Sequence, residues 1–272
     1  MSAPEPRRAS RSLTLLASVA TIAAGAVVTL PAPLAAQDAA GGRALAGRVS
    51  QAGSGTVRFS FASREGVCGN GRNISVRTSR DVEWESDCEP GPVRVALSLR
   101  DGRVTDVRSY VGGRWRADSP AADLGMVSAP AAAAYLLDLA STLPAGPAED
   151  AVFPSTIADS ATVWPTLLRI ARDGSRPERV RRQAVFWVGQ AAGEEAGRGL
   201  TELVDEGDAD LKLREHAVFA LSQRPADESV PALIRIARTS QSPRLRQRAI
   251  FWLGQSRDPR ALEYFEEVLV RR

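Results

Sequence analysis

Residues 245–254 read LRQRAIFWLG, and residues 180–189 read VRRQAVFWVG. The centre of each stretch is a tripeptide, Ala-Val-Phe or Ala-Ile-Phe, that recurs along the chain and begins at Ala151, Ala184, Ala217 and Ala249. The steps between these alanines are 33, 33 and 32 residues. A fixed period of about 20 to 50 residues is typical of proteins built from stacked structural repeats. The sequence therefore predicts a repeat fold.

A second apolar pattern with the same period precedes each tripeptide. It comprises Leu167, Ile170 and Ala171, then Leu200, Leu203 and Val204, then Leu233, Ile236 and Ala237, and finally Phe265, Val268 and Leu269. Both patterns have helical spacing, so each repeat is predicted to be a pair of helices. One pair cannot bury its apolar face alone, so neighbouring pairs must stack into an α-solenoid of about four pairs. We place the solenoid at residues 128–272, with units at 128–160, 161–193, 194–226 and 227–257 and a C-terminal cap helix at 258–272.

The stretches at 180–189 and 245–254 resemble the second helix of a HEAT repeat of the short bacterial kind, which is also found in phycobilisome-lyase-like proteins. The segment Asp258-Pro259-Arg260-Ala261-Leu262 resembles that family's link into the next first helix. The resemblance covers about half the chain and implies a right-handed solenoid that binds other proteins; a few members act on bilin chromophores. Pro154 stands where other units have Trp187 or Trp252, so the first unit is expected to be degenerate, with a bent or short second helix.

Helical geometry divides each second helix into two faces. With 100° per residue, the positions four before and four after the repeated alanine share its line, so Val180, Ala184 and Val188 form a buried stripe. The phenylalanine two positions after the alanine lies on the opposite side. We hypothesise a partner-binding groove there, lined by Phe186, Phe219, Phe251, Arg179, Arg182, Lys212, Arg244, Gln190, Gln223 and Gln255.

A competing interpretation is that neighbouring repeats cover these phenylalanine rings and make them part of the core, and the sequence leaves both open. Trp187 and Trp252 lie nearer the buried stripe, and we expect them in the core. Arg181, Arg214 and Arg246 are expected to form a polar ladder between repeats.

Residues 56–118 have a different pattern and predict a small antiparallel β-rich domain, so the fold class is α+β with two domains. Alternating apolar residues in Val57–Phe61 and in Val93–Leu99 indicate half-buried strands. Asp101-Gly102 predicts a type I′ hairpin turn. Val104 and Val107 have opposite parity after this turn, so either a bulge intervenes or the second strand is weakly specified.

Cys68 and Cys88 are the two cysteines of the chain, and we expect one disulfide between them. Two cysteines and one distant histidine do not supply a tetrahedral metal site. Acidic residues alternate with other side chains from Asp81 to Glu89. A solvated strand face is favoured there over a calcium site, because the spacing is not that of a calcium-binding loop.

The N-terminus has three arginines, an apolar run at 13–30 and small residues before a possible cleavage after Ala36, the three parts of a secretory signal peptide. Residues 1–36 are therefore predicted to be removed, leaving a periplasmic or secreted protein with no membrane insertion; an uncleaved membrane anchor is the alternative. Residues 37–55, rich in Ala and Gly, predict a flexible lead-in. Without residues 1–36 the chain has 32 basic and 31 acidic residues, which gives no reason to expect nucleic acid as a partner.

His216 is the only histidine, so a Ser-His relay or a histidine metal triad has no second member. Neither cysteine is free to act as a nucleophile if both are paired. The function favoured by the sequence is an exported, non-enzymatic scaffold that binds unidentified protein partners and needs no cofactor. The alternatives are a lyase-like or cofactor-handling enzyme and a structural envelope protein.

Overall fold

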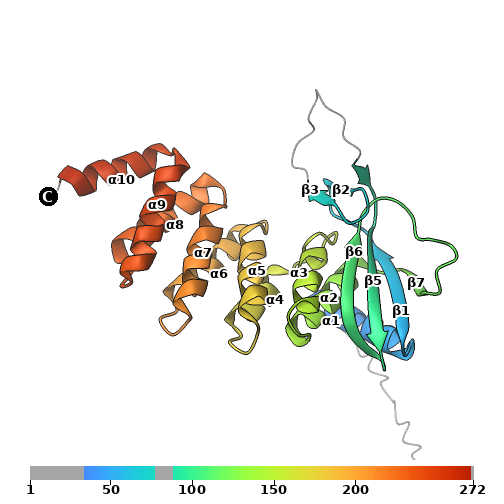
Figure 1. Ribbon diagram of the computed structural model, residues 1–272. Helices are drawn as coiled ribbons and strands as arrows, with labels where there is room; N and C mark the ends of the chain where they lie inside the picture. Colours follow the sequence, from blue (N-terminus) through green and yellow to red (C-terminus); the bar gives the residue numbers. More distant parts are fainter. Residues whose placement is uncertain (1–33, 77–87, 271–272) are drawn as a thin grey trace, which may run out of the picture. The chain divides into compact units, whose positions relative to one another are not determined.

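The computed structural model describes residues 34–76 and 88–270, in which a β-rich part precedes a series of paired helices (Figure 1). This arrangement confirms the α+β fold class. The apolar run at 13–30 and the acidic segment 81–87 lie outside the described residues, so the expectations for them stay predictions. Among the helices that the structure describes, none is long and apolar enough to cross a membrane.

Four strands form the larger sheet, in the order β6-β5-β1-β7. The antiparallel strands are β1 (Gly55–Phe61), β5 (Val93–Arg100) and β6 (Arg103–Tyr110). Asp101 and Gly102 have φ angles of 51° and 71°, so the predicted type I′ turn is confirmed. Ser98 pairs with Asp106 and Leu99 with Val104, which leaves Thr105 as an extra residue. This β-bulge accounts for the opposite parity of Val104 and Val107.

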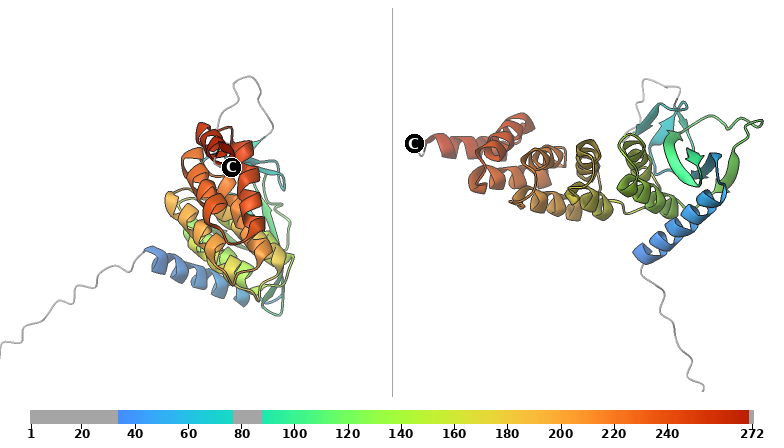
Figure 2. Two further views of the ribbon diagram at one scale, coloured as in Figure 1. Left: turned by 90° about the vertical axis from the view of Figure 1, so that its left-hand side faces the viewer. Right: turned by 60° about the horizontal axis from the view of Figure 1, so that its bottom comes forward.

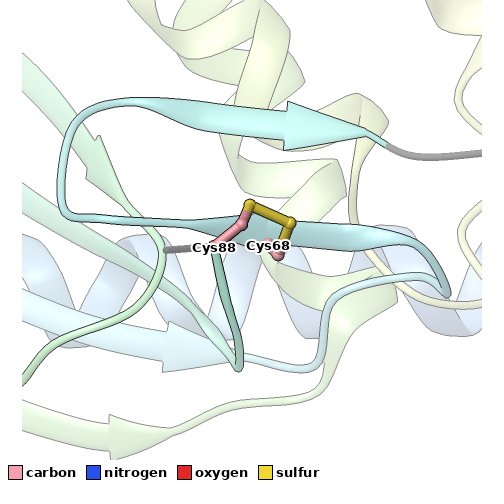
Figure 3. The surroundings of a disulfide bond; sticks show 2 residues. All are labelled: Cys68 and Cys88. Carbon is pink, nitrogen blue, oxygen red and sulfur yellow. A yellow bond between two sulfur atoms is a disulfide. The ribbon is translucent and has the colours of Figure 1, made fainter. Parts of the chain in front are cut away.

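A three-stranded sheet of order β3-β2-β4 lies in the same part of the chain. It consists of β2 (Val67–Gly69), β3 (Ile74–Val76) and β4 (Glu89–Pro90). Figure 3 shows the predicted disulfide, which joins Cys68 in β2 to Cys88 just before β4. The bond joins the central strand of this sheet, β2, to the residue that precedes β4.

The prediction of a flexible lead-in at 37–55 is wrong, because Leu34–Gln51 forms helix α1, which lies beside α2 (Ala129–Thr142; Figure 2). Gly41 and Gly42 allow this contact: a Cβ atom on Gly41 would lie 2.8 Å from the Cβ of Ala131. Leu45 and Val49, one helical turn apart, are buried in the core. The small Ala and Gly residues, whose composition is like that of a linker, therefore allow the two helices to pack closely.

Strand β7 (Ala122–Met126) was also not predicted, since the β-rich domain was expected to end at 118. It runs parallel to β1 and joins the sheet at its edge. Its residues favour strands weakly, because Asp and Gly are depleted in strands. Pairing with β1, and the ion pair of Asp123 with Arg58 at 2.9 Å, hold it in place.

The helix pairs follow the predicted units. They are α2 with α3 (Pro147–Thr156), α4 (Trp164–Arg172) with α5 (Glu178–Gly189), α6 (Glu194–Asp205) with α7 (Leu211–Ser222), and α8 (Ala226–Thr239) with α9 (Pro243–Ser256); α10 (Pro259–Val270) follows. Helix α3 has 10 residues with Pro154 inside it, and α5 has 12. The expectation of a short second helix in the first unit is confirmed.

Helices of the same kind contact each other along the stack. The first helices touch in the order α2, α4, α6, α8 and α10, and the second helices in the order α3, α5, α7 and α9. The predicted stripe of Val180, Ala184 and Val188 is fully buried. The helices and the sheet share one hydrophobic core, in which Phe59 of β1 lies 6.4 Å, ring to ring, from Tyr135 of α2.

The arginines expected to form a ladder between repeats act within a repeat instead. Arg181 donates to the carbonyl of Ala171 at 2.9 Å and Arg214 to that of Val204 at 2.8 Å, so each joins its second helix to the end of its own first helix. The carbonyls at a helix C-terminus lack intrahelical partners, and a cation there is favoured by the helix dipole. Other arginines link neighbouring repeats: Arg224 donates to the carbonyls of Ala191 and Gly193 at 2.9 and 2.7 Å.

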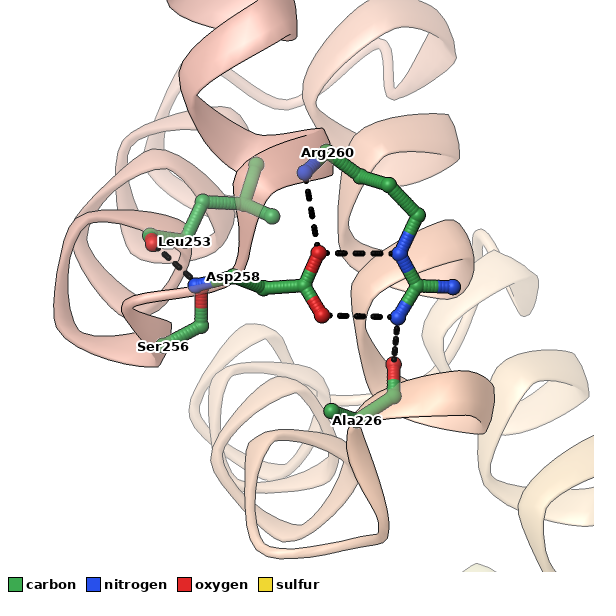
Figure 4. A network of polar contacts seen from close by, with 5 residues as sticks. All are labelled: Ala226, Leu253, Ser256, Asp258 and Arg260. Carbon is green, nitrogen blue, oxygen red and sulfur yellow. Dashed lines mark hydrogen bonds and ion pairs between the residues drawn. The ribbon is translucent and has the colours of Figure 1, made fainter.

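Arg260 makes the equivalent link at the start of α10 (Figure 4). Its Nη2 donates to the carbonyl of Ala226 at 2.9 Å and to Oδ2 of Asp258 at 2.8 Å. Its Nε donates to Oδ1 of Asp258 at 2.8 Å. Asp258 also accepts from the backbone N–H of Arg260. These hydrogen bonds stabilise the ionised form and lower the pKa of Asp258 to about 2. The Asp-Pro-Arg segment thus caps α10 and attaches it to α8.

Candidate functional site: an aromatic ladder on the second helices

The phenylalanines of the repeated tripeptide lie next to one another on the second helices. The rings of Phe186 and Phe219 are stacked with their centroids 6.5 Å apart. Trp252 lies 5.3 Å from Phe219 and 5.0 Å from Phe251. At the other end, Trp187 lies 5.1 Å from Phe186 and 5.2 Å from Phe153 of α3. We call these six residues, which run from α3 to α9, the aromatic ladder.

The ladder is partly exposed. Phe186 and Phe251 expose 36% and 52% of their surface, whereas Phe219 is half-buried between its neighbours. Trp187 and Trp252, which were expected in the core, are also half-buried and pack against its edge. The ladder is therefore anchored in the core on one side and open to a partner on the other.

Two hollows lie along the ladder. The first, of about 430 Å³, is lined by Glu149, Asp150, Arg179, Arg182, Gln183, Phe186, His216 and Phe219. The second, of about 250 Å³, is lined by Arg182, Lys212, Glu215, His216, Phe219, Arg248 and Trp252. They adjoin because Arg182, His216 and Phe219 line both. We call the two hollows together the second-helix groove.

Charged side chains in the groove are joined by ion pairs between neighbouring repeats. Glu215 contacts Arg244 at 2.8 Å and Arg248 at 3.3 Å, and its own side chain is only 10% exposed. Arg179 contacts Glu149 at 3.8 Å. Arg182 contacts Glu178 of its own helix at 3.2 Å. Lys212 makes no ion pair within residues 34–76 and 88–270, and its side chain is exposed.

Two groups in the groove have shifted pKa values. Burial, and then the charge of Arg182, lower the pKa of His216, so its imidazole is neutral at pH 7. Burial raises the pKa of Asp150, and the carboxylates of Asp106 and Glu149 add to the effect. Burial is the largest cause of both shifts, and the neighbouring charges contribute less.

The structure places some of the predicted binding residues together and separates others. Arg179, Arg182, Phe186, Lys212 and Phe219 line the groove. Arg244 lies at the rim of the groove, where it forms an ion pair with Glu215. Phe251 extends the ladder beyond the groove. Gln190, Gln223 and Gln255 line neither hollow, because they lie at the C-terminal ends of their helices.

Several residues of the groove were not predicted as binding residues. Glu149 and Glu215 precede the repeated alanine by two positions, as the predicted Arg182 does. The position one before it is taken by Asp150, Gln183, His216 and Arg248. These positions lie one helical turn before the phenylalanine and on the same face. The period itself could therefore have identified them.

A comparison with protein-family models agrees with this geometry. Residues 198–272 match a model described as HEAT repeats. The helix pairs within these residues match HEAT repeats. A search of curated proteins found no match to the chain.

The HEAT repeats present a surface suited to binding. Exposed aromatic rings beside arginines are the composition of interface anchors, because they combine large apolar area with several hydrogen-bond donors.

Proposed function

We propose that this protein is an exported, non-enzymatic scaffold that binds a segment of another protein in the second-helix groove of its HEAT repeats. The observation that carries the proposal is the exposure of two rings of the aromatic ladder: Phe186 lines the groove beside Arg179 and Arg182, and Phe251 extends the ladder beyond the groove. Exposure of the same aromatic position in two of the repeats adds nothing to the stability of the chain alone. Covering these rings with a partner would remove apolar area from water.

Export is supported by two features of the chain. The predicted signal peptide would direct it out of the cytoplasm. The disulfide between Cys68 and Cys88 fits an oxidising compartment, since such bonds are rare in the cytosol.

The double variant Phe186→Ala/Phe251→Ala tests the proposal. Both side chains are exposed, so the variant should keep its fold, whereas Phe219 is half-buried and is left in place. Protein that lacks only the predicted signal peptide would be used to capture partners from an envelope extract. Its affinity for a captured partner would then be measured for the wild type and the variant. Loss of two aromatic anchors should weaken binding by about tenfold or more.

Met126→Ala is the matched control, because Met126 is 64% exposed but lies on β7, outside the repeats. This variant should capture partners as the wild type does. Unchanged partner binding by a folded Phe186→Ala/Phe251→Ala variant would show that the groove is not the binding site.

A further inference from the structure

The charge of the second-helix groove is uneven along its length. Among the charged residues that line the hollow at α3 and α5, Glu149 and Asp150 balance Arg179 and Arg182. The hollow at α7 and α9 shares Arg182, which is paired with Glu178, and adds Lys212 and Arg248 against one acid, Glu215. That acid is almost covered by Arg244 and Arg248. A partner therefore meets an excess of positive charge at the α7 and α9 end.

The position of these cations is unusual for their helices. Arg179, Lys212 and Arg244 each occupy the second residue of α5, α7 and α9. A helix N-terminus carries partial positive charge, so a cation there is unfavourable. The first helices vary: Glu194 begins α6 and Asp227 lies in the first turn of α8, whereas Arg260 is the second residue of α10. On α5, α7 and α9 these cations lie along the groove, where an anionic partner can reach them.

One pair of rings in the ladder has a spacing that matches an extended partner. The rings of Phe186 and Phe219 are 6.5 Å apart. In an extended chain, side chains on one face are separated by two residues, about 6.6 Å. Apolar side chains at alternate positions of an extended segment would therefore have the same spacing as these two rings. The hollow of about 250 Å³ beside Phe219 and Trp252 is smaller than the pockets that enclose small molecules, roughly 300–1,000 Å³, and has room for single side chains.

We infer that the partner is an extended, acidic protein segment with apolar side chains at alternate positions, whose carboxylates lie over Lys212, Arg182 and Arg248 while its apolar side chains lie on the aromatic ladder. This inference rests on the proposed function and adds the chemistry of the partner. His216 faces Arg182 and Glu178 of α5, Arg248 of α9 and Glu215 of its own helix, and a bound carboxylate would add negative charge beside it.

Three synthetic peptides of one length test the inference. One alternates Glu with Leu, the second has Gln in place of every Glu, and the third has Lys. Binding of each labelled peptide to the full chain is measured by fluorescence anisotropy at about 25 and about 150 mM salt, because screening weakens exposed charge pairs. The Glu peptide should bind at least tenfold more tightly than the Gln peptide at low salt, and the Lys peptide most weakly.

Lys212→Gln is the informative variant, because Lys212 is exposed and its loss removes no ion pair among the described residues. It should weaken the Glu peptide about three- to tenfold and leave the Gln peptide unchanged. The control is Arg198→Gln on α6, which removes the same charge outside the groove at a side chain that is 68% exposed. It should change neither affinity.

The single histidine provides an independent readout. The NMR titration of His216 should show a higher pKa with the Glu peptide bound than with the Gln peptide, because a nearby carboxylate favours the imidazolium form. Equal or tighter binding of the Gln or Lys peptide, or no binding of the Glu peptide at about 1 mM, overturns the inference. If the Gln or Lys peptide binds and binding is lost in Phe186→Ala/Phe251→Ala, the proposed function stands and only the acidic character of the partner is wrong.

Discussion

At the scale of single residues, arginine has two tasks in this protein. Arg181, Arg214 and Arg224 donate to carbonyls at helix ends and hold the stack together. Arg182 and Arg248 line the groove instead, beside His216. The guanidinium group suits the first task because its donors are spread over a rigid plane and can reach several carbonyls.

His216 should make stability depend on pH. Its pKa in the folded protein lies below the value of about 6.5 in the unfolded chain, so below pH 6.5 the unfolded chain binds a proton that the folded protein does not. The free energy of unfolding should therefore fall on acidification from pH 6.5 towards the lowered pKa. His216→Gln, the residue found at the equivalent Gln183, should remove this part of the slope. Urea unfolding of both proteins above and below pH 6.5 measures it, and identical slopes would contradict the assignment.

At the scale of helices, equivalent glycines of the repeat have different environments. Gly189 ends α5, where a Cβ atom would lie 2.8 Å from the carbonyl oxygen of Ala220 in α7. Gly254 occupies the same place in the motif of α9 but has open space around it. The first glycine is needed for contact between successive second helices, and the second is not.

Alanine substitution should separate these cases. Gly189→Ala should lower the free energy of unfolding by about 1–3 kcal/mol, because the added methyl group overpacks the contact with α7. Gly254→Ala should raise it by about 0.5–1 kcal/mol, because alanine favours a helix more than glycine does. Urea denaturation measures both changes. A shift of the same sign in the two variants would show that helix contact does not distinguish them.

At the scale of the whole molecule, the β-rich part and the HEAT repeats are not independent. Helix α1 lies on α2, strand β6 contacts α3, and Phe59 packs near Tyr135. The described residues of both parts belong to one hydrophobic cluster. The first repeat, whose second helix is shortened by Pro154, is covered by the β-rich part and not by another helix pair.

This arrangement predicts that the β-rich part stabilises the repeats. Residues 128–272 produced alone should unfold at a lower urea concentration than the chain from residue 37, because α2 and α3 lose the apolar cover provided by α1 and the sheet. The helical circular dichroism signal measures the unfolding of the repeats in both proteins. Equal midpoints would mean that the degenerate repeat is self-sufficient.

The repeat fold, the hairpin at Asp101-Gly102 and the disulfide could be predicted from the sequence, because period, turn chemistry and cysteine number can be read along the chain. Helical geometry also placed Phe186, Phe219 and Phe251 on the face opposite the buried stripe. The exposure of each ring could not be predicted, since it depends on neighbours about 33 residues away in the next repeat. The tertiary structure was also needed to show that Lys212 and Arg182 line the groove whereas the predicted glutamines do not. It showed that Arg181 and Arg214 donate to carbonyls of their own repeats, and that α1 is a packed helix.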